Sequence, residues 1–185
     1  MNKPSLILLA AICSLACVCT AQDTNSLKTQ IGVFESRTGS VIIKGFGPVG
    51  SVVAGSDEVS VRIKETTDVS IGQKAYGLAI EIEGNPFPQD RIYIDDDEVD
   101  PLLNALNYLL KIKYDVTALP SFEASFTTKA GLRVMANSIR REGAIQHSLQ
   151  YGERPRILLT SIQMTQLYGL IAQARKNLDA LKAGK

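Results

Sequence analysis

The chain has 185 residues, with 20 lysines and arginines against 19 aspartates and glutamates, and 45% of its residues are apolar. This length suits one domain with a core of its own, and the apolar content excludes a largely disordered protein. The near-zero net charge argues against nucleic acid as a partner, because a protein that binds phosphates is expected to carry a basic excess.

The N-terminus has the order of a secretory signal peptide. Lys3 supplies a positive charge, residues 6–18 are almost entirely apolar, and small residues precede Gln22. The apolar run is shorter than the ~20 residues that a helix needs to span a bilayer. We therefore predict a signal peptide over residues 1–21 and export to the periplasm or the extracellular space. The mature chain is expected to have no transmembrane segment.

All three cysteines, Cys13, Cys17 and Cys19, lie within this signal. Cleavage after Ala21 would leave a domain with no disulfide, no thiol nucleophile and no thiolate metal site. The run Ser14-Leu15-Ala16-Cys17 resembles a bacterial lipoprotein cleavage box, although its leucine lies one place too close to the cysteine. Soluble export is our expectation, and a lipid anchor on Cys17 is the alternative.

The mature sequence is dominated by alternation of apolar and polar residues, after a flexible segment expected at residues 22–29. Such alternation predicts antiparallel strands with one buried and one solvated face. Gly-rich or Asp-rich breaks between the alternating runs predict turns. The predicted strands cover residues 32–36, 40–46, 49–54, 59–63, 76–83, 91–95, 122–126, 132–136, 144–151 and 156–160.

The segment Gly45-Phe46-Gly47-Pro48-Val49-Gly50 fits the G-x-G-x-x-G pattern of dinucleotide-binding proteins. That chemistry requires the glycines to open a helix whose N–H groups hold a pyrophosphate. Here a proline and then β-branched residues follow, so we predict a hairpin turn. No cofactor is expected.

Two helices are predicted, from about Asp97 to Lys113 and from about Ile162 to Leu181. Asp95 with Glu98, and Thr160 with Gln163, have the spacing of capping boxes. Pro101 would then lie deep in the first helix. A later start, with Asp100 as the cap and Pro101 in the first position, would remove that conflict.

The second helix carries an apolar seam that predicts packing on a sheet. At ~1.5 Å per residue the helix would reach roughly 30 Å, so its last turns would extend beyond a small sheet. An apolar seam kept in register there would need a cover, by a second copy or by another protein. The expected partner-binding residues are Met164, Leu167, Ile171, Leu178 and Leu181.

The two halves of the mature chain are similar at a fixed offset: Arg91–Asp95 aligns with Arg156–Thr160, and Leu102 matches Leu167. We predict an α+β fold, an antiparallel sheet with two helices. One domain is expected over residues 30–182, built from pseudo-repeats at about 30–116 and 121–182. Each repeat would have several strands followed by one helix.

Four strands followed by a helix, given twice, resembles the Whirly and PUR families of single-strand nucleic-acid binders. The resemblance lies in the order of elements and implies a module that binds single-stranded nucleic acid. The export signal, the neutral charge and the few aromatic residues on polar strand faces depart from those families. Ser40–Gly47 and Lys74–Ile82 are also similar to exported bacterial proteins of no assigned function.

Acidic residues gather before the first predicted helix, and their oxygens are the ligand type that calcium prefers, although the spacing is not that of an EF-hand. Acidic residues at a helix N-terminus are also favoured by the helix dipole. We interpret the cluster as capping and dipole compensation, with an ion site as the alternative. Its members are Asp95, Asp96, Asp97, Glu98 and Asp100.

His147 is the only histidine and shares strand parity with Ile145 and Leu149, which predicts a structural role. No nucleophile-elbow sequence accompanies it, so no catalytic residue is assigned. The basic pairs at 140–141 and 154–156 are interpreted as solvated faces. We predict an exported, non-enzymatic binding protein that acts through the sheet or the C-terminal helix. A single-stranded nucleic-acid-binding module and a hydrolase that uses carboxylates are the alternatives.

Overall fold

The computed structural model describes residues 28–84, 89–139 and 143–184, and its fold is α+β as predicted. The first sheet contains β1 (Ile42–Ala54), β2 (Asp57–Asp68), β3 (Gln73–Gly84) and β4 (Asp90–Asp95) in that order, followed by α2 (Asp96–Lys111). The second sheet contains β5 (Glu123–Thr127), β6 (Arg133–Ile139), β7 (Ala144–Gln150) and β8 (Ile157–Leu159), followed by α3 (Ser161–Ala183). All neighbouring strands are antiparallel.

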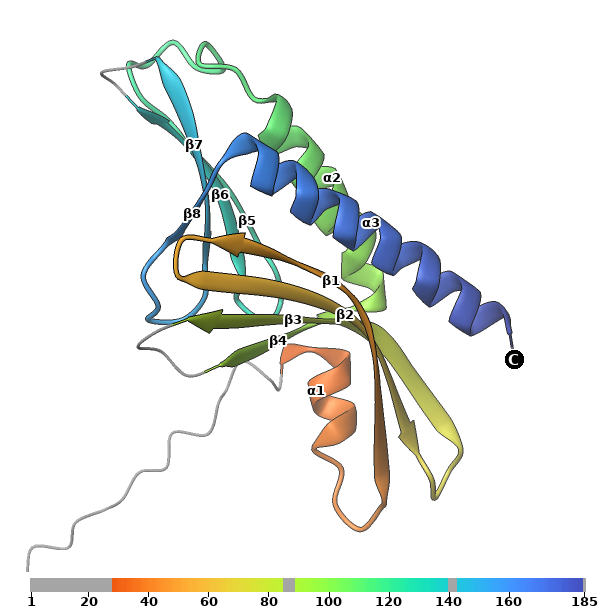
Figure 1. The fold of residues 1–185 in the computed structure, drawn as a ribbon. Helices are drawn as coiled ribbons and strands as arrows, with labels where there is room; N and C mark the ends of the chain where they lie inside the picture. The colour runs from red at the N-terminus through yellow and green to blue at the C-terminus, as the bar shows by residue number, and fades with distance from the viewer. Residues whose placement is uncertain (1–27, 85–88, 140–142, 185) are drawn as a thin grey trace, which may run out of the picture.

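Among the described residues, the second half has the four strands and one helix expected from the sequence, whereas the first half has four strands where six were expected. A duplication of the two units stays a prediction. Figure 1 shows α2 and α3 side by side on one face of the first sheet and a short helix, α1 (Gln30–Glu35), on the other. The second sheet lies beside α2 and the first turns of α3. One continuous core joins side chains of both sheets and of α2 and α3, among them Val61, Ile80, Leu102, Val134 and Ile171.

Residues 32–36 were predicted as a strand, but residues 30–35 are helical. Thr29 caps this helix, because its Oγ1 accepts the N–H of Gly32 at 2.9 Å, and it is fully buried although it was expected in a flexible segment. Ile31 and Phe34 share the helix face that is buried on the first sheet. Gly77 makes room for this contact, since a Cβ there would lie 2.5 Å from Cδ1 of Ile31.

The hairpin turn predicted within Gly45–Gly50 is also wrong, because β1 runs through it with a bulge between Pro48 and Gly50. Proline is tolerated here because β1 is the edge strand of its sheet. The glycines serve packing: a Cβ on Gly50 would lie 2.7 Å from Cδ2 of Leu170 on α3. A bulge and a close helix approach therefore explain a pattern that resembles a nucleotide-binding loop.

Both helices start at the capping boxes that the sequence predicts. Asp95 and Glu98 form the first box, so Pro101 does lie inside α2, and the later start at Asp100 is wrong. At α3, the N–H of Thr160 donates to Oε1 of Gln163 at 2.8 Å and the N–H of Gln163 donates to Oγ1 of Thr160 at 3.2 Å.

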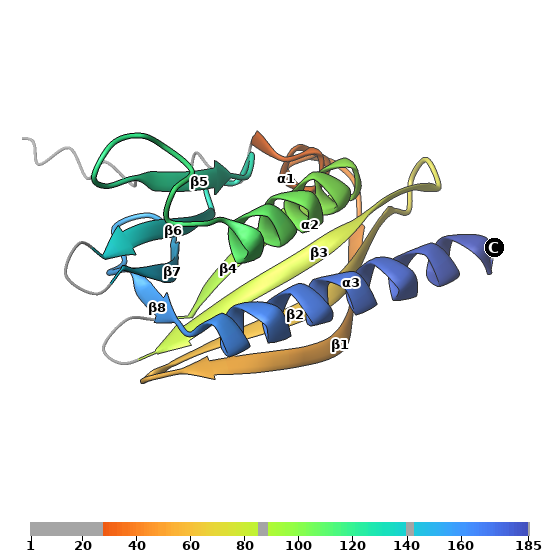
Figure 2. The same cartoon turned by 90° about the horizontal axis from the view of Figure 1, so that it is seen from above.

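The apolar seam of α3 lies inside the monomer. Met164, Leu167, Ile171 and Leu178 are at most 2% exposed, and only Leu181, at 37%, reaches the surface. The expected overhang of Leu178 is therefore wrong. The helix packs along β1, β2 and β3 of the first sheet and beside α2 (Figure 2), and Lys182 near its end still pairs with Asp96 of α2, so the seam stays covered there. Among the described residues, no helix is long and apolar enough to cross a membrane.

Candidate binding sites on the polar face of the first sheet

The acidic cluster of residues 95–100 forms a junction between elements. Asp95 accepts the N–H groups of Gln30 at 2.7 Å and Ile31 at 3.1 Å, so it holds the start of α1. Oε1 of Glu98 accepts the N–H of Lys129 at 2.7 Å, and burial raises the pKa of this carboxyl. The two side chains thus bind different parts of the chain.

The other carboxylates of the cluster bind cations from distant segments. Asp96 lies 2.9 Å from Arg175 and 2.5 Å from Lys182, both on α3, and Asp97 lies 2.8 Å from Lys129. Asp100 lies 3.8 Å from Arg175. Within residues 28–84, 89–139 and 143–184, no group of three or more His, Cys, Asp or Glu side chains is arranged to hold a metal. The cluster therefore serves to join α1, α2 and α3.

His147 lies in the interior of the second sheet, where β7 pairs with both β6 and β8. The residue is 4% exposed, and burial lowers the pKa of its imidazole. Its Nδ1 is buried and has no hydrogen-bond partner among the described residues. The position fits the structural role that strand parity predicts.

Arg154 was predicted on a solvated face, but it is 5% exposed and joins the two sheets. Its Nε lies 2.5 Å from Asp90, a terminal nitrogen lies 3.3 Å from Asp57, and another donates to the carbonyl of Ile82. Arg156 is exposed as expected and pairs with Glu123. The pair at 140–141 and Cys17 lie outside the described residues.

A group of charged and aromatic side chains occupies the face of the first sheet that is opposite α2 and α3. Strand register places them together, because Phe46 lies opposite Lys64, Ala79 lies between Arg62 and Tyr93, and Glu81 lies opposite Arg91. Glu35, from α1, reaches the same group. We call it the polar-face cluster, and its members are Glu35, Lys44, Phe46, Arg62, Lys64, Glu81, Arg91 and Tyr93.

Lys64 is the buried centre of this cluster. Its side chain is 0% exposed, and its Nζ lies 2.6 Å from Oε1 of Glu35. The same ammonium lies 4.3 Å from the ring centre of Phe46 and 4.0 Å from that of Tyr93, within cation–π range. Burial lowers the pKa of Lys64, against the bond to Glu35, which raises it.

Glu35 is held by three partners. Oε2 lies 2.7 Å from Nζ of Lys44, and Oε1 accepts the hydroxyl of Thr66 at 3.0 Å in addition to its contact with Lys64. Burial by itself raises the pKa of Glu35, but these bonds together bring it below its ordinary value. Burial, together with the charge of Glu35, raises the pKa of Tyr93.

In the outer part of the cluster, two arginines face solvent and the carboxylate that binds them is buried. Nε of Arg91 lies 2.6 Å from Glu81, and a terminal nitrogen of Arg62 lies 3.6 Å from the same carboxylate. Both guanidinium groups lie over the ring of Phe46, at 5.0 and 5.5 Å from its centre. The side chains of Arg62 and Arg91 are 35% and 42% exposed, against 6% for Glu81.

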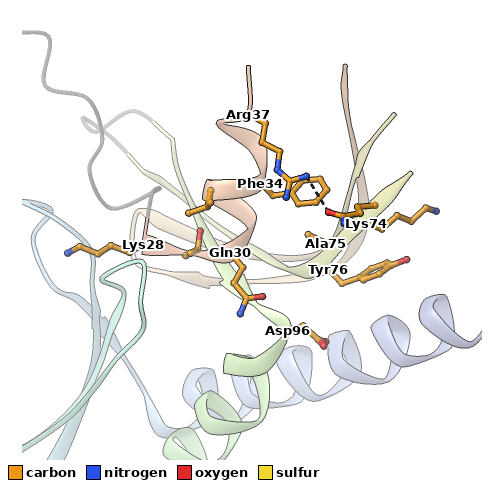
Figure 3. Close-up of a pocket in the computed structure, with 11 residues that line it drawn as sticks. Lys28, Gln30, Phe34, Arg37, Lys74, Ala75, Tyr76 and Asp96 are labelled. Carbon is orange, nitrogen blue, oxygen red and sulfur yellow. Dashed lines mark hydrogen bonds between the residues drawn. The ribbon is translucent and has the colours of Figure 1, made fainter. Parts of the chain in front are cut away.

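A cleft of about 580 Å³ lies on the other side of α1 (Figure 3). Its lining comes from α1, from Gln73–Tyr76 at the start of β3, and from Asp96 at the start of α2. Figure 3 shows Gln30 pointing from α1 toward Asp96, with Tyr76 at the side. Arg37 lies 3.2 Å from Asp68 and Lys74 lies 2.9 Å from Glu65, while Lys28 is an exposed cation of the lining.

Sequence reasoning missed both sites. Lys64 occupies a position that alternation assigns to a solvated face, but Glu35 of α1 and the rings of Phe46 and Tyr93 cover it. No signal in the sequence indicated that cover, since residues 32–36 favoured a strand.

Comparisons of this chain with protein-family models, with curated proteins and with solved structures give no match. The resemblance to the Whirly and PUR families therefore stays a prediction.

Proposed function

We propose that this chain is an exported, non-enzymatic binding protein that holds an anionic partner on the polar-face cluster. One observation carries the proposal: Lys44, Arg62 and Arg91 are 35–43% exposed, while the carboxylates that hold them, Glu35 and Glu81, are 6–9% exposed. The four cations of the cluster outnumber its two carboxylates, and three of the four cations face solvent.

The chemistry of the exposed groups suits an oxyanion. A guanidinium group presents planar N–H donors that match carboxylate, sulfate and phosphate oxygens. Stacking over Phe46 and pairing with Glu81 fix the orientation of Arg91 and Arg62, which lowers the entropy lost when a partner binds. Exposed ion pairs contribute little to folding stability, so stability alone is a weak reason for this arrangement.

The partner should present a compact anionic group. Glu58 and Glu83 lie opposite each other at the end of the same face, and both are exposed. A long polyanion that followed the whole face would meet this acidic pair and be repelled. Single-stranded nucleic acid gains support from Phe46 and Tyr93, because bases stack on aromatic rings. Cations already cover both rings, so we favour the compact anion.

The test compares two double variants with the same change in charge. Lys44→Gln with Arg62→Gln removes two outward cations and leaves Arg91 on Glu81. Lys111→Gln with Lys113→Gln removes two exposed cations near the end of α2. We expect a trisulfated heparin disaccharide to shift the amide signals of β2 and β4 in the wild type and in the α2 variant, and not in the first variant.

Equal binding by all three proteins, or none by the wild type, would show that the cluster is not the site. Tighter binding of a short oligothymidylate than of the disaccharide would favour the nucleic-acid alternative. Export is tested separately by the intact mass of the exported product. A chain that starts at Gln22 supports soluble export, and a diacylglycerol increment on Cys17 supports the lipid anchor.

A further inference from the structure

At the start of β3, the edge of the first sheet on the β4 side has room for a further strand. We call this position, where β4 would lie if it were longer, the lane of β4. β4 pairs with β3 only from Gly77 to Ile82, because the chain leaves the sheet at Asp95 and enters α2. β3 begins four residues earlier, and Gln73–Tyr76 pair with β2 on their other side. Among the described strands, none continues the lane of β4 along this segment. The cleft of about 580 Å³ lies in that position.

The strand register directs backbone groups into this lane. Alternate residues of an antiparallel strand turn their N–H and C=O groups toward opposite neighbours. Val69 donates to the carbonyl of Val41, the residue before β1, so Asp68 turns toward β3 and its partner Gln73 turns toward β2. Lys74 must then turn its N–H and C=O groups away from β2, toward the cleft that it lines.

The walls of the cleft favour a neutral, partly apolar ligand. Val33 on α1 is 52% exposed at the cleft, beside the largely buried ring of Phe34. Arg37, Lys74 and Asp96 each have an opposite charge within about 3.2 Å. The fourth charged side chain of the lining, Lys28, is exposed, so solvent and salt screen its attraction to an ion. A strand edge beside a helix is the arrangement by which proteins bind extended peptides through main-chain hydrogen bonds.

We propose that the cleft binds an extended peptide segment as an added strand beside β3, with an apolar side chain of the peptide against Val33. The backbone of Lys74 supplies main-chain hydrogen bonds, and the lane left by β4 supplies the space. This site is separate from the polar-face cluster, since α1 stands between them, and it does not depend on the proposed function.

The test asks whether binding depends on backbone N–H groups. The probe is a pool of acetylated, amidated tetrapeptides built from Val, Thr, Leu and Phe. Its matched control is the same pool with N-methylated backbones, which keeps the side chains and removes the donors. We expect the first pool to shift the Lys74 amide signal and slow its hydrogen exchange in the full mature protein, and the second pool to do neither.

Two variants test whether peptide binding depends on the backbone N–H of Lys74. Lys74→Pro removes the N–H that faces the cleft, and proline is tolerated where a strand N–H points away from its sheet. Lys74→Thr loses the same pairing with Glu65 but keeps the N–H. We expect Lys74→Pro to weaken binding about tenfold or more and Lys74→Thr to bind as the wild type does.

Equal binding of both peptide pools, equal losses in both variants, or no binding by the wild type at millimolar peptide would each overturn the proposal. If Lys74→Pro fails to fold, the comparison of the two pools on the wild type decides alone. Loss of peptide binding in Lys44→Gln with Arg62→Gln would also count against it, because that variant alters only the polar-face cluster.

Discussion

Lys64 and Glu35 form an ion pair that fastens α1 to the first sheet: Nζ lies 2.6 Å from Oε1, and the lysine side chain has no exposed surface. Taking two charges out of water is costly, and their attraction offsets that cost only in good geometry. Here the aromatic rings of Phe46 and Tyr93 flank the ammonium. Removing one partner of such a pair therefore costs more folding stability than replacing both partners with apolar residues.

We expect Glu35→Gln to destabilise the protein by about 3–5 kcal/mol, because it leaves a buried ammonium without its counter-charge. The measurement is the free energy of unfolding in urea. Lys44→Gln is the matched control, since Lys44 binds the same carboxylate but is 43% exposed. It should cost at most about 1 kcal/mol. Similar small losses in both variants would show that Lys64 reaches water or another partner.

Acid should weaken the attachment of α1 and the neighbouring hairpin. The bonds of Glu35 to Lys44, Lys64 and Thr66 outweigh its burial and lower its pKa, and hydrogen bonds, first from Ser40, lower that of Asp68. A carboxyl with a lowered folded-state pKa contributes stability that is complete above the unfolded pKa, about 4. That stability is lost as the pH falls through the folded-state pKa.

Removal of the Ser40 hydroxyl, which bonds to Asp68, should raise the folded-state pKa of Asp68. Ser40→Ala should then lose stability at a higher pH than the wild type does, in urea unfolding measured from pH 7 to pH 2. Asp68→Asn should have a flatter pH dependence than either, because position 68 no longer titrates. Identical acid profiles for all three proteins would contradict the assignment.

Arg154 should be needed for the contact between the two sheets. It is 5% exposed and binds Asp57, Asp90 and the carbonyl of Ile82. We expect Arg154→Gln to cost about 1–3 kcal/mol of unfolding free energy, because it leaves the buried carbonyl of Ile82 without its donor and removes the cation between Asp57 and Asp90. Arg156→Gln, two residues away and exposed, should cost at most about 1 kcal/mol. Equal costs would mean that Arg154 is solvated as the sequence suggested.

Leu178 and Leu181 lie on the same helix, but Leu178 is buried in the core and Leu181 reaches the surface. Leu178→Ala should cost about 2–5 kcal/mol in thermal or urea unfolding, as core leucines do. Leu181→Ala should cost under about 1 kcal/mol, because its side chain is 37% exposed. If Leu178→Ala left the unfolding free energy unchanged but altered the sedimentation coefficient, the apolar residues of α3 would bind a partner as the sequence suggested.

The sequence by itself determined the elements whose signals are local. Alternation in Tyr76–Ile82 predicted β3, because successive strand residues face opposite sides of a sheet. The spacing of Thr160 and Gln163 predicted the start of α3, because a capping box is formed within four residues. The seam of Met164, Leu167 and Ile171 predicted an apolar helix face, and that face is buried.

Only the tertiary structure decided what covers each face. Residues 30–35 became helical where Ile31 and Phe34 pack on the sheet, and Glu35 of that helix binds the buried Lys64. Leu178 became core because α3 packs on the first sheet and on α2 as far as the pair of Lys182 with Asp96. The cleft exists because β4 ends opposite Gly77, four residues short of the start of β3. Whether a residue is buried depends on neighbours that are distant in the chain. The periodicity of a helix or strand indicates which residues share a face, but not which element packs on that face.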